Sequence, residues 1–172
     1  MNGITRREWL LATACWGEVL RAQTGAERLV YFDAGTAAEV EALAETILPA
    51  DDKPGAREAG VIWFIDRALA GYDKDLQPVY SSGLREVQTR RAALFPGSVD
   101  IAGLTAEQRT ALVRDMEKTE LFGLLRKHTV LGFFGSPKYG GNRNGASAKV
   151  LGYQEAMMYT PPFGYYDREG AQ

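Results

Sequence analysis

Residues 105–134 read TAEQRTALVRDMEKTELFGLLRKHTVLGFF, and this pattern predicts two consecutive helices. The first four residues form a capping box, in which the Thr105 hydroxyl can accept from a first-turn amide and Gln108 can reach back. The residues expected on the buried face then recur at helical spacing: Leu112, Val113, Met116, Leu121, Leu124, Leu125, His128 and Leu131. Helices of this kind favour an all-α fold.

Three further helices are expected upstream of this pair. A second capping box, Thr36-Ala37-Ala38-Glu39, predicts a helix that ends before Pro49. Helical spacing also predicts helices over residues 57–70 and from about 75 to 94. Strand-like character is confined to the brief run Leu29-Val30-Tyr31-Phe32, which we interpret as a linker.

The composition changes abruptly after Phe134. Residues 135–145 read GSPKYGGNRNG, and no regular element is expected to accommodate so many glycines. A tail rich in tyrosine and phenylalanine follows, and rings in an irregular segment are candidates for burial against another surface. We therefore predict a small helical domain with a long irregular Gly-rich and aromatic C-terminal tail, and we expect a partner to order both segments.

Composition excludes several classes of function. The 172 residues suit one domain, and a net charge of -2 provides no basic excess for binding nucleic acid. With one cysteine and one histidine, the chain alone cannot build a structural zinc site, an iron–sulfur cluster or a CxxCH haem attachment. It also lacks the glycine fingerprint of a dinucleotide-binding fold. We expect no cofactor and no metal in this chain.

The N-terminus resembles a twin-arginine export signal. Arg6 and Arg7 stand directly before a short apolar stretch, residues 10–17, which is too short to span a bilayer. Small residues suited to cleavage follow at Ala22 and at residues 24–26. The alternative is an ordinary amphipathic N-terminal helix. A signal implies periplasmic localisation through the Tat translocase.

These features divide the chain into four expected parts. We expect residues 1–26 to be a signal peptide and residues 27–35 to be a linker. Residues 36–153 form the helical domain and 154–172 the C-terminal tail.

A long motif runs through the second half of the chain, in residues 128–130, 132–135, 137, 139–143 and 152–153, with upstream support from residues 44–49 and Gly60-Val61. This motif resembles the gluconate 2-dehydrogenase subunit 3 family. The resemblance covers roughly residues 36–155, with Ala148 standing where the family often has tryptophan. The residues of this motif are also our candidate interface: His128, Gly132, Phe133, Phe134, Pro137, Tyr139, Gly140, Gly141, Asn142, Arg143, Gly152 and Tyr153.

This resemblance implies that the chain is a subunit of an enzyme complex and does not itself carry out the reaction. Members of the family are small subunits that pair with a large flavoprotein of the glucose-methanol-choline (GMC) type, often together with a cytochrome c subunit. The large subunit holds FAD and oxidises the sugar or sugar acid. The resemblance therefore implies a non-catalytic partner whose export signal carries the folded flavoprotein, and which its partners can hold at the membrane.

Several residues invite other interpretations. His128 could be a general base, but its place on the predicted apolar face favours a structural role. An alternative function is a stand-alone periplasmic sugar-binding protein or small enzyme that uses His128 and the loop 139–143. Asp51 and Asp52 are expected to be a solvated turn rather than a metal site. Lys138 and Arg143 could meet a partner's carboxylate or remain solvated.

Overall fold

The structure, a computed structural model, describes residues 28–152. The expected export signal with Arg6 and Arg7, and the tail from Tyr153 onwards, lie outside the described residues. Within 28–152 the chain forms six α-helices, three short 3-10 helices and no strand, so the predicted all-α class is confirmed. None of the helices in this range is both long enough and apolar enough to cross a bilayer.

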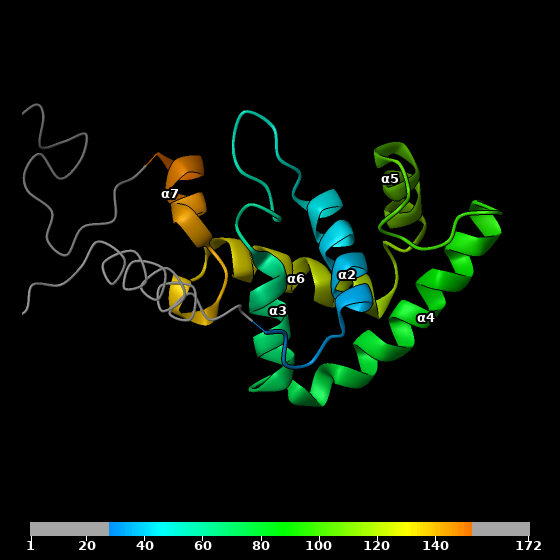
Figure 1. Cartoon of the computed structure of the whole chain (residues 1–172), viewed down its shortest axis with the longest axis horizontal. Coiled ribbons are helices and arrows are strands. Elements are labelled where there is room, and N and C mark those ends of the chain that lie inside the picture. Colours follow the sequence, from blue (N-terminus) through cyan, green and yellow to red (C-terminus); the bar gives the residue numbers. More distant parts are fainter. Residues whose placement is uncertain (1–27, 153–172) are drawn as a thin grey trace, which may run out of the picture.

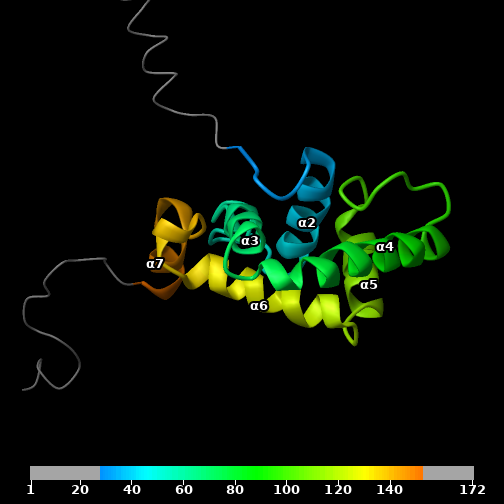
Figure 2. The same ribbon diagram turned by 90° about the horizontal axis from the view of Figure 1, so that it is seen from below.

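The helices are arranged around α6, which runs along the length of the domain (Figure 1). Helices α2, α3 and α4 pack on α6, while α5 contacts α2 and α4 and α7 packs against α6 (Figure 2). The bounds are α2 (Ala34–Ile47), α3 (Val61–Ala70), α4 (Gln77–Leu94), α5 (Ala106–Asp115), α6 (Glu120–Phe134) and α7 (Ala146–Leu151). The 3-10 helices are η1 (Lys74–Leu76), η2 (Pro137–Tyr139) and η3 (Arg143–Gly145).

The two predicted capping boxes have different outcomes. The box at Thr105 is confirmed, because its hydroxyl accepts from the Gln108 amide at 3.3 Å and the Gln108 side chain accepts from the Thr105 amide at 3.0 Å. The box at Thr36 is wrong. Asp33 caps α2 instead, and its carboxylate accepts from the Thr36 amide at 2.9 Å and from the Thr36 hydroxyl at 2.7 Å. These bonds lower the pKa of Asp33, because they favour its charged form.

The segment before α2 is fastened to α3 through Asp66. This carboxylate is buried and accepts three backbone N–H groups, from Val30 at 2.7 Å and from Tyr31 and Phe32 at 2.9 Å each. A buried carboxylate is costly unless it is hydrogen-bonded. The three N–H groups offset that cost, and the carboxylate in turn satisfies these backbone donors. The expected linker is therefore packed on the domain, and Phe32 belongs to the core.

Helix α6 buries one face and exposes another. Its buried residues are Leu121, Leu125, His128, Thr129, Gly132 and Phe133. Leu131, which we expected on this face, is 42% exposed. Successive residues of an α-helix are turned by about 100°, so Leu131 points to a different side from Gly132. The sequence correctly predicted the helix and misplaced one residue on it.

Candidate functional site

The glycine-rich segment packs directly against α6. The Asn142 amide donates to the Gly132 carbonyl at 2.8 Å, joining the segment's backbone to the helix. A Cβ added at Gly141 would lie 2.0 Å from that same carbonyl oxygen, so only glycine fits. We expected residues 135–145 to have no regular structure and to need a partner for order. The structure instead folds them within the chain as η2 and η3, leading into α7.

Asn142 holds this segment together. Its side chain is buried, and its Nδ2 donates to the Gly135 carbonyl at 3.0 Å while its Oδ1 accepts from the Ser147 amide at 2.9 Å. The backbone adopts the left-handed conformation, with φ of 47°, which asparagine tolerates better than most residues. One residue thus links the end of α6 to the first turn of α7.

The two basic residues of the segment have different surroundings. Arg143 lies inside the chain's own structure, with its guanidinium 4.8 Å from the Trp63 ring centroid and its Nε donating to the Gly140 carbonyl at 3.1 Å. Its amide also donates to the Ala59 carbonyl at 3.0 Å. Lys138 is exposed and lies over the Tyr139 ring at 4.8 Å. Of the two, Lys138 is the one available to an outside group.

His128 is fully buried and hydrogen-bonded through both ring nitrogens. Its Nε2 lies 3.0 Å from Oδ2 of Asp73, and its Nδ1 lies 3.0 Å from the Tyr80 hydroxyl. A carboxylate only accepts, so the proton of the neutral imidazole is on Nε2 and Tyr80 donates to Nδ1. Burial lowers the His128 pKa more than Asp73 raises it. Burial also raises the pKa of Tyr80, which keeps its hydroxyl protonated.

The residues of the family motif divide into an inward and an outward set. His128, Gly132, Phe133, Gly140, Gly141 and Asn142 are buried. Phe134, Pro137 and Tyr139 are exposed, and Gly152 caps the end of α7. The inward set fastens the loop to α6, so only the outward set can meet another molecule.

An exposed apolar surface extends from this outward set. We call it the apolar face, and it consists of Tyr72, Val130, Leu131, Phe134 and Tyr139. A pocket of about 380 Å³ lies within it, with Tyr72, Leu131, Tyr139, Gly135 and Phe64 as its walls. Sequence reasoning missed Tyr72 and Val130, because no local pattern indicates that they are exposed beside the loop.

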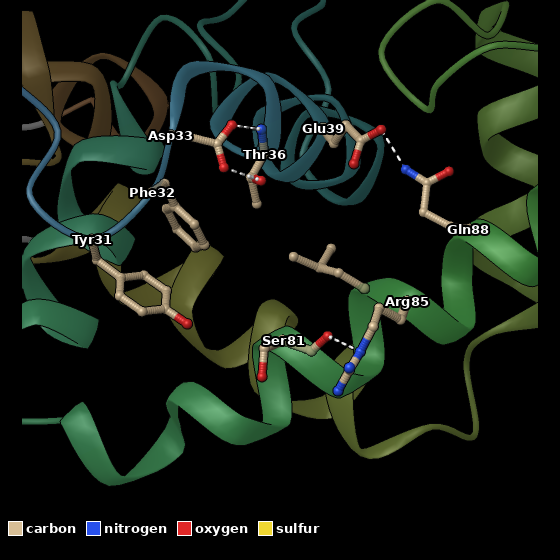
Figure 3. Close-up of a pocket in the computed structure, with 9 residues that line it drawn as sticks. Tyr31, Phe32, Asp33, Thr36, Glu39, Ser81, Arg85 and Gln88 are labelled. Atoms are coloured by element: carbon tan, nitrogen blue, oxygen red, sulfur yellow. Dashed lines mark hydrogen bonds between the residues drawn. The ribbon is translucent and has the colours of Figure 1, made fainter.

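A second pocket, of about 480 Å³, lies between the start of α2 and α4 (Figure 3). Its carboxylates and guanidinium are already hydrogen-bonded within the chain. Asp33 holds Thr36, Glu39 accepts from Gln88, and the Nε of Arg85 donates to the Ser81 carbonyl at 3.1 Å. These bonds cap the start of α2 and join α2 to α4.

A metal site is not formed among the residues that the structure describes. Among these residues, there is no group of three or more histidine, cysteine, aspartate or glutamate side chains that could hold a metal ion. The exposed Asp51 instead accepts from the Lys53 amide at 2.8 Å, as in an Asx turn.

Comparison with known proteins identifies a family for this chain. Neither a search of curated proteins nor a search of solved structures returned a match. The family model described as gluconate 2-dehydrogenase subunit 3 matches residues 34–157. This range begins at the first residue of α2 and includes α6, the packed glycine-rich segment and α7. The chain therefore belongs to the gluconate 2-dehydrogenase subunit 3 family.

Proposed function

We propose that this chain is the non-catalytic small subunit of an exported, flavin-dependent dehydrogenase of a sugar or sugar acid. A large subunit of the GMC type holds FAD and carries out the oxidation, and in this family such a complex often includes a cytochrome c subunit. The observation that carries this proposal is the family match over residues 34–157, which covers most of the chain. Its description names a subunit of a dehydrogenase.

The surroundings of His128 support a non-catalytic role. A general base must come within hydrogen-bond reach of the proton that it removes. His128 is enclosed by the core, and both of its ring nitrogens already have partners. The alternative of a stand-alone sugar-binding protein or small enzyme needs His128 and the loop 139–143 to meet a ligand. Because Gly140, Gly141 and Asn142 of that loop are also buried, the geometry favours the subunit.

We further propose that the chain acts as an escort. The Tat pathway reads a paired-arginine address, here Arg6 and Arg7, and a partner bound to the chain would travel with it. This places the assembled enzyme in the periplasm, where its partners can hold it at the membrane.

Purification from the native host tests this function. A C-terminal tag on the chain should retain a large subunit with flavin absorbance, and the pair should reduce a dye in the presence of a sugar or sugar acid. The chain alone should have no flavin absorbance and no such activity. Turnover by the isolated chain would favour the stand-alone enzyme, and recovery of the chain without any flavoprotein would contradict the proposed complex.

A further inference from the structure

Exposed apolar side chains are concentrated at one end of the domain. Within residues 28–152, nine large hydrophobic residues are exposed, and five of them form the apolar face. Val130, Leu131 and Phe134 lie on one side of α6 because of their helical spacing. Tyr72 and Tyr139 join them across the 380 Å³ pocket. Clustered apolar exposure of this kind marks an interaction site more often than scattered residues do.

One wall of the pocket, Phe64, is held in place by the fold. Phe64, on α3, is buried, and its ring meets the His128 ring edge to face at a centroid distance of 6.2 Å. A Cβ on Gly132 would lie 3.1 Å from the Phe64 side chain, so α3 and α6 are in close contact behind the pocket. Because this wall is already ordered, little conformational entropy is lost in ordering it when a partner binds.

The charged residues that flank the apolar face on α6 and in the glycine-rich segment are basic. Residues 121–152 contain five basic residues and no acidic residue, although the whole chain has a net charge of -2. Lys127 precedes Leu131 by one helical turn, and Lys138 lies over the ring of Tyr139. Asp73, next to Tyr72, is hydrogen-bonded to His128. The rim of the face is therefore basic along α6 and η2, and this part of the rim suits an acidic surface.

From these observations we infer that the apolar face is the docking surface for the flavoprotein large subunit. The partner inserts an aromatic or aliphatic side chain into the pocket beside Leu131 and surrounds it with carboxylates that face Lys127 and Lys138. An anchor residue in a pocket with a polar rim is the usual anatomy of a protein–protein interface. This inference rests on the proposed function, and it centres the interface on α6, next to the exposed Lys138 and Tyr139 of the glycine-rich segment.

A matched pair of charged substitutions tests the docking surface. Leu131→Glu places a carboxylate at the centre of the apolar face. Leu94→Glu places a carboxylate at the end of α4, outside that face. The two leucines are similarly exposed, at 42% and 45%, so each variant should fold. With the full chain and the flavoprotein, Leu131→Glu should weaken the complex at least ~30-fold, as expected at an interface centre. With Leu94→Glu, the dissociation constant of the complex should stay within about twofold of the wild-type value.

Charge reversal gives a second measurement. Replacing Lys127 and Lys138 together with glutamate should lower the association rate constant and reduce its dependence on salt. Equal binding by wild type and Leu131→Glu would overturn the docking surface while leaving the subunit role intact. Failure of the wild-type chain to bind the flavoprotein would instead overturn the proposed function.

The same binding experiments would also reveal two other possible occupants of the apolar face. If Leu131→Glu abolishes binding to vesicles of anionic phospholipid but not to the flavoprotein, the face contacts a membrane and our inference is wrong. If deletion of residues 154–172 strengthens flavoprotein binding and makes it insensitive to Leu131→Glu, the face belongs to the chain's own tail and the inference is also wrong. Unchanged sensitivity to Leu131→Glu after that deletion supports docking of the large subunit.

Discussion

The hydroxyl of Tyr80 and the Nδ1 of His128 lie 3.0 Å apart in the core of the domain, where they join α4 to α6. Their rings are nearly parallel, with an interplanar angle of 14° and a centroid distance of 5.8 Å. Neither side chain is exposed. The bond therefore joins two buried polar groups that have no access to water, and such groups are costly to leave unpaired.

Removing the Tyr80 hydroxyl should destabilise the domain. Tyr80→Phe leaves Nδ1 of His128 without its donor, which should lower the free energy of unfolding by about 1–3 kcal/mol. Urea denaturation followed by circular dichroism measures this change. Tyr72→Phe is the matched control, because Tyr72 is 63% exposed and its hydroxyl can bond to water. Equal stabilities of the two variants would contradict the importance of the buried bond.

Stability should fall as the pH drops below about 6.5 because of His128. Its pKa is lowered from the model-peptide value of 6.5 in the folded state, chiefly by burial, so the unfolded chain binds the proton more readily. The stabilisation is therefore complete above the unfolded pKa and is lost as the pH falls from there towards the folded pKa. The slope can reach about 1.4 kcal/mol per pH unit.

The chain contains one histidine, so NMR titration of the imidazole is unambiguous. Its midpoint in the folded protein should lie below 6.5. A midpoint above that value would show that Asp73 outweighs burial, and the pH dependence would then have the opposite sign.

Asp66 should be needed to hold the segment before α2. Asp66→Asn replaces an acceptor of three backbone N–H groups with an amide that must turn its own N–H₂ towards some of them. We expect a loss of about 2–3 kcal/mol in unfolding free energy. Amide hydrogen exchange at Val30, Tyr31 and Phe32 should also accelerate. Asp75→Asn, at an exposed position, should change neither measurement.

Two glycines on or beside α6 should respond in opposite ways to alanine. Gly141→Ala places a Cβ against the Gly132 carbonyl and should displace the loop, with a loss of about 1–3 kcal/mol. A Cβ at Gly123, within α6, would meet no atom within 4 Å. Gly123→Ala should therefore stabilise the helix by about 0.5–1 kcal/mol. Thermal melts of both variants compare them directly, and a neutral Gly141→Ala would argue against close packing of the loop.

The proposed export signal should act on two proteins at once. Changing Arg6 and Arg7 together to lysine should leave both this chain and the flavoprotein in the cytoplasm, because the pair is read by a receptor. Cell fractionation with antibodies against each protein measures their location. Arrival of the flavoprotein in the periplasm without this chain would contradict the escort role.

The sequence alone determined where most helices lie. Apolar spacing and the Thr105 capping box are local properties, since a helix satisfies its hydrogen bonds within a few residues. They correctly predicted α5 and α6, and they predicted α4, which begins at Gln77 rather than near residue 75. At α2 the same reasoning failed by three residues, because the Asp33 carboxylate caps the helix in place of Thr36. The family motif was also readable in the sequence.

Tertiary structure decided which residues meet and which remain exposed. Asp73 and Tyr80 are 55 and 48 residues from His128, so no local pattern could pair them with its ring. The glycine-rich segment is ordered because its backbone lies against the Gly132 carbonyl, a contact that depends on how α6 passes beneath it. Leu131 is exposed because α3 and the loop pack on the adjoining sides of α6 and leave its own side uncovered. Sequence spacing fixes the angle of a residue around its helix, but only the packing of other elements decides which angles are buried.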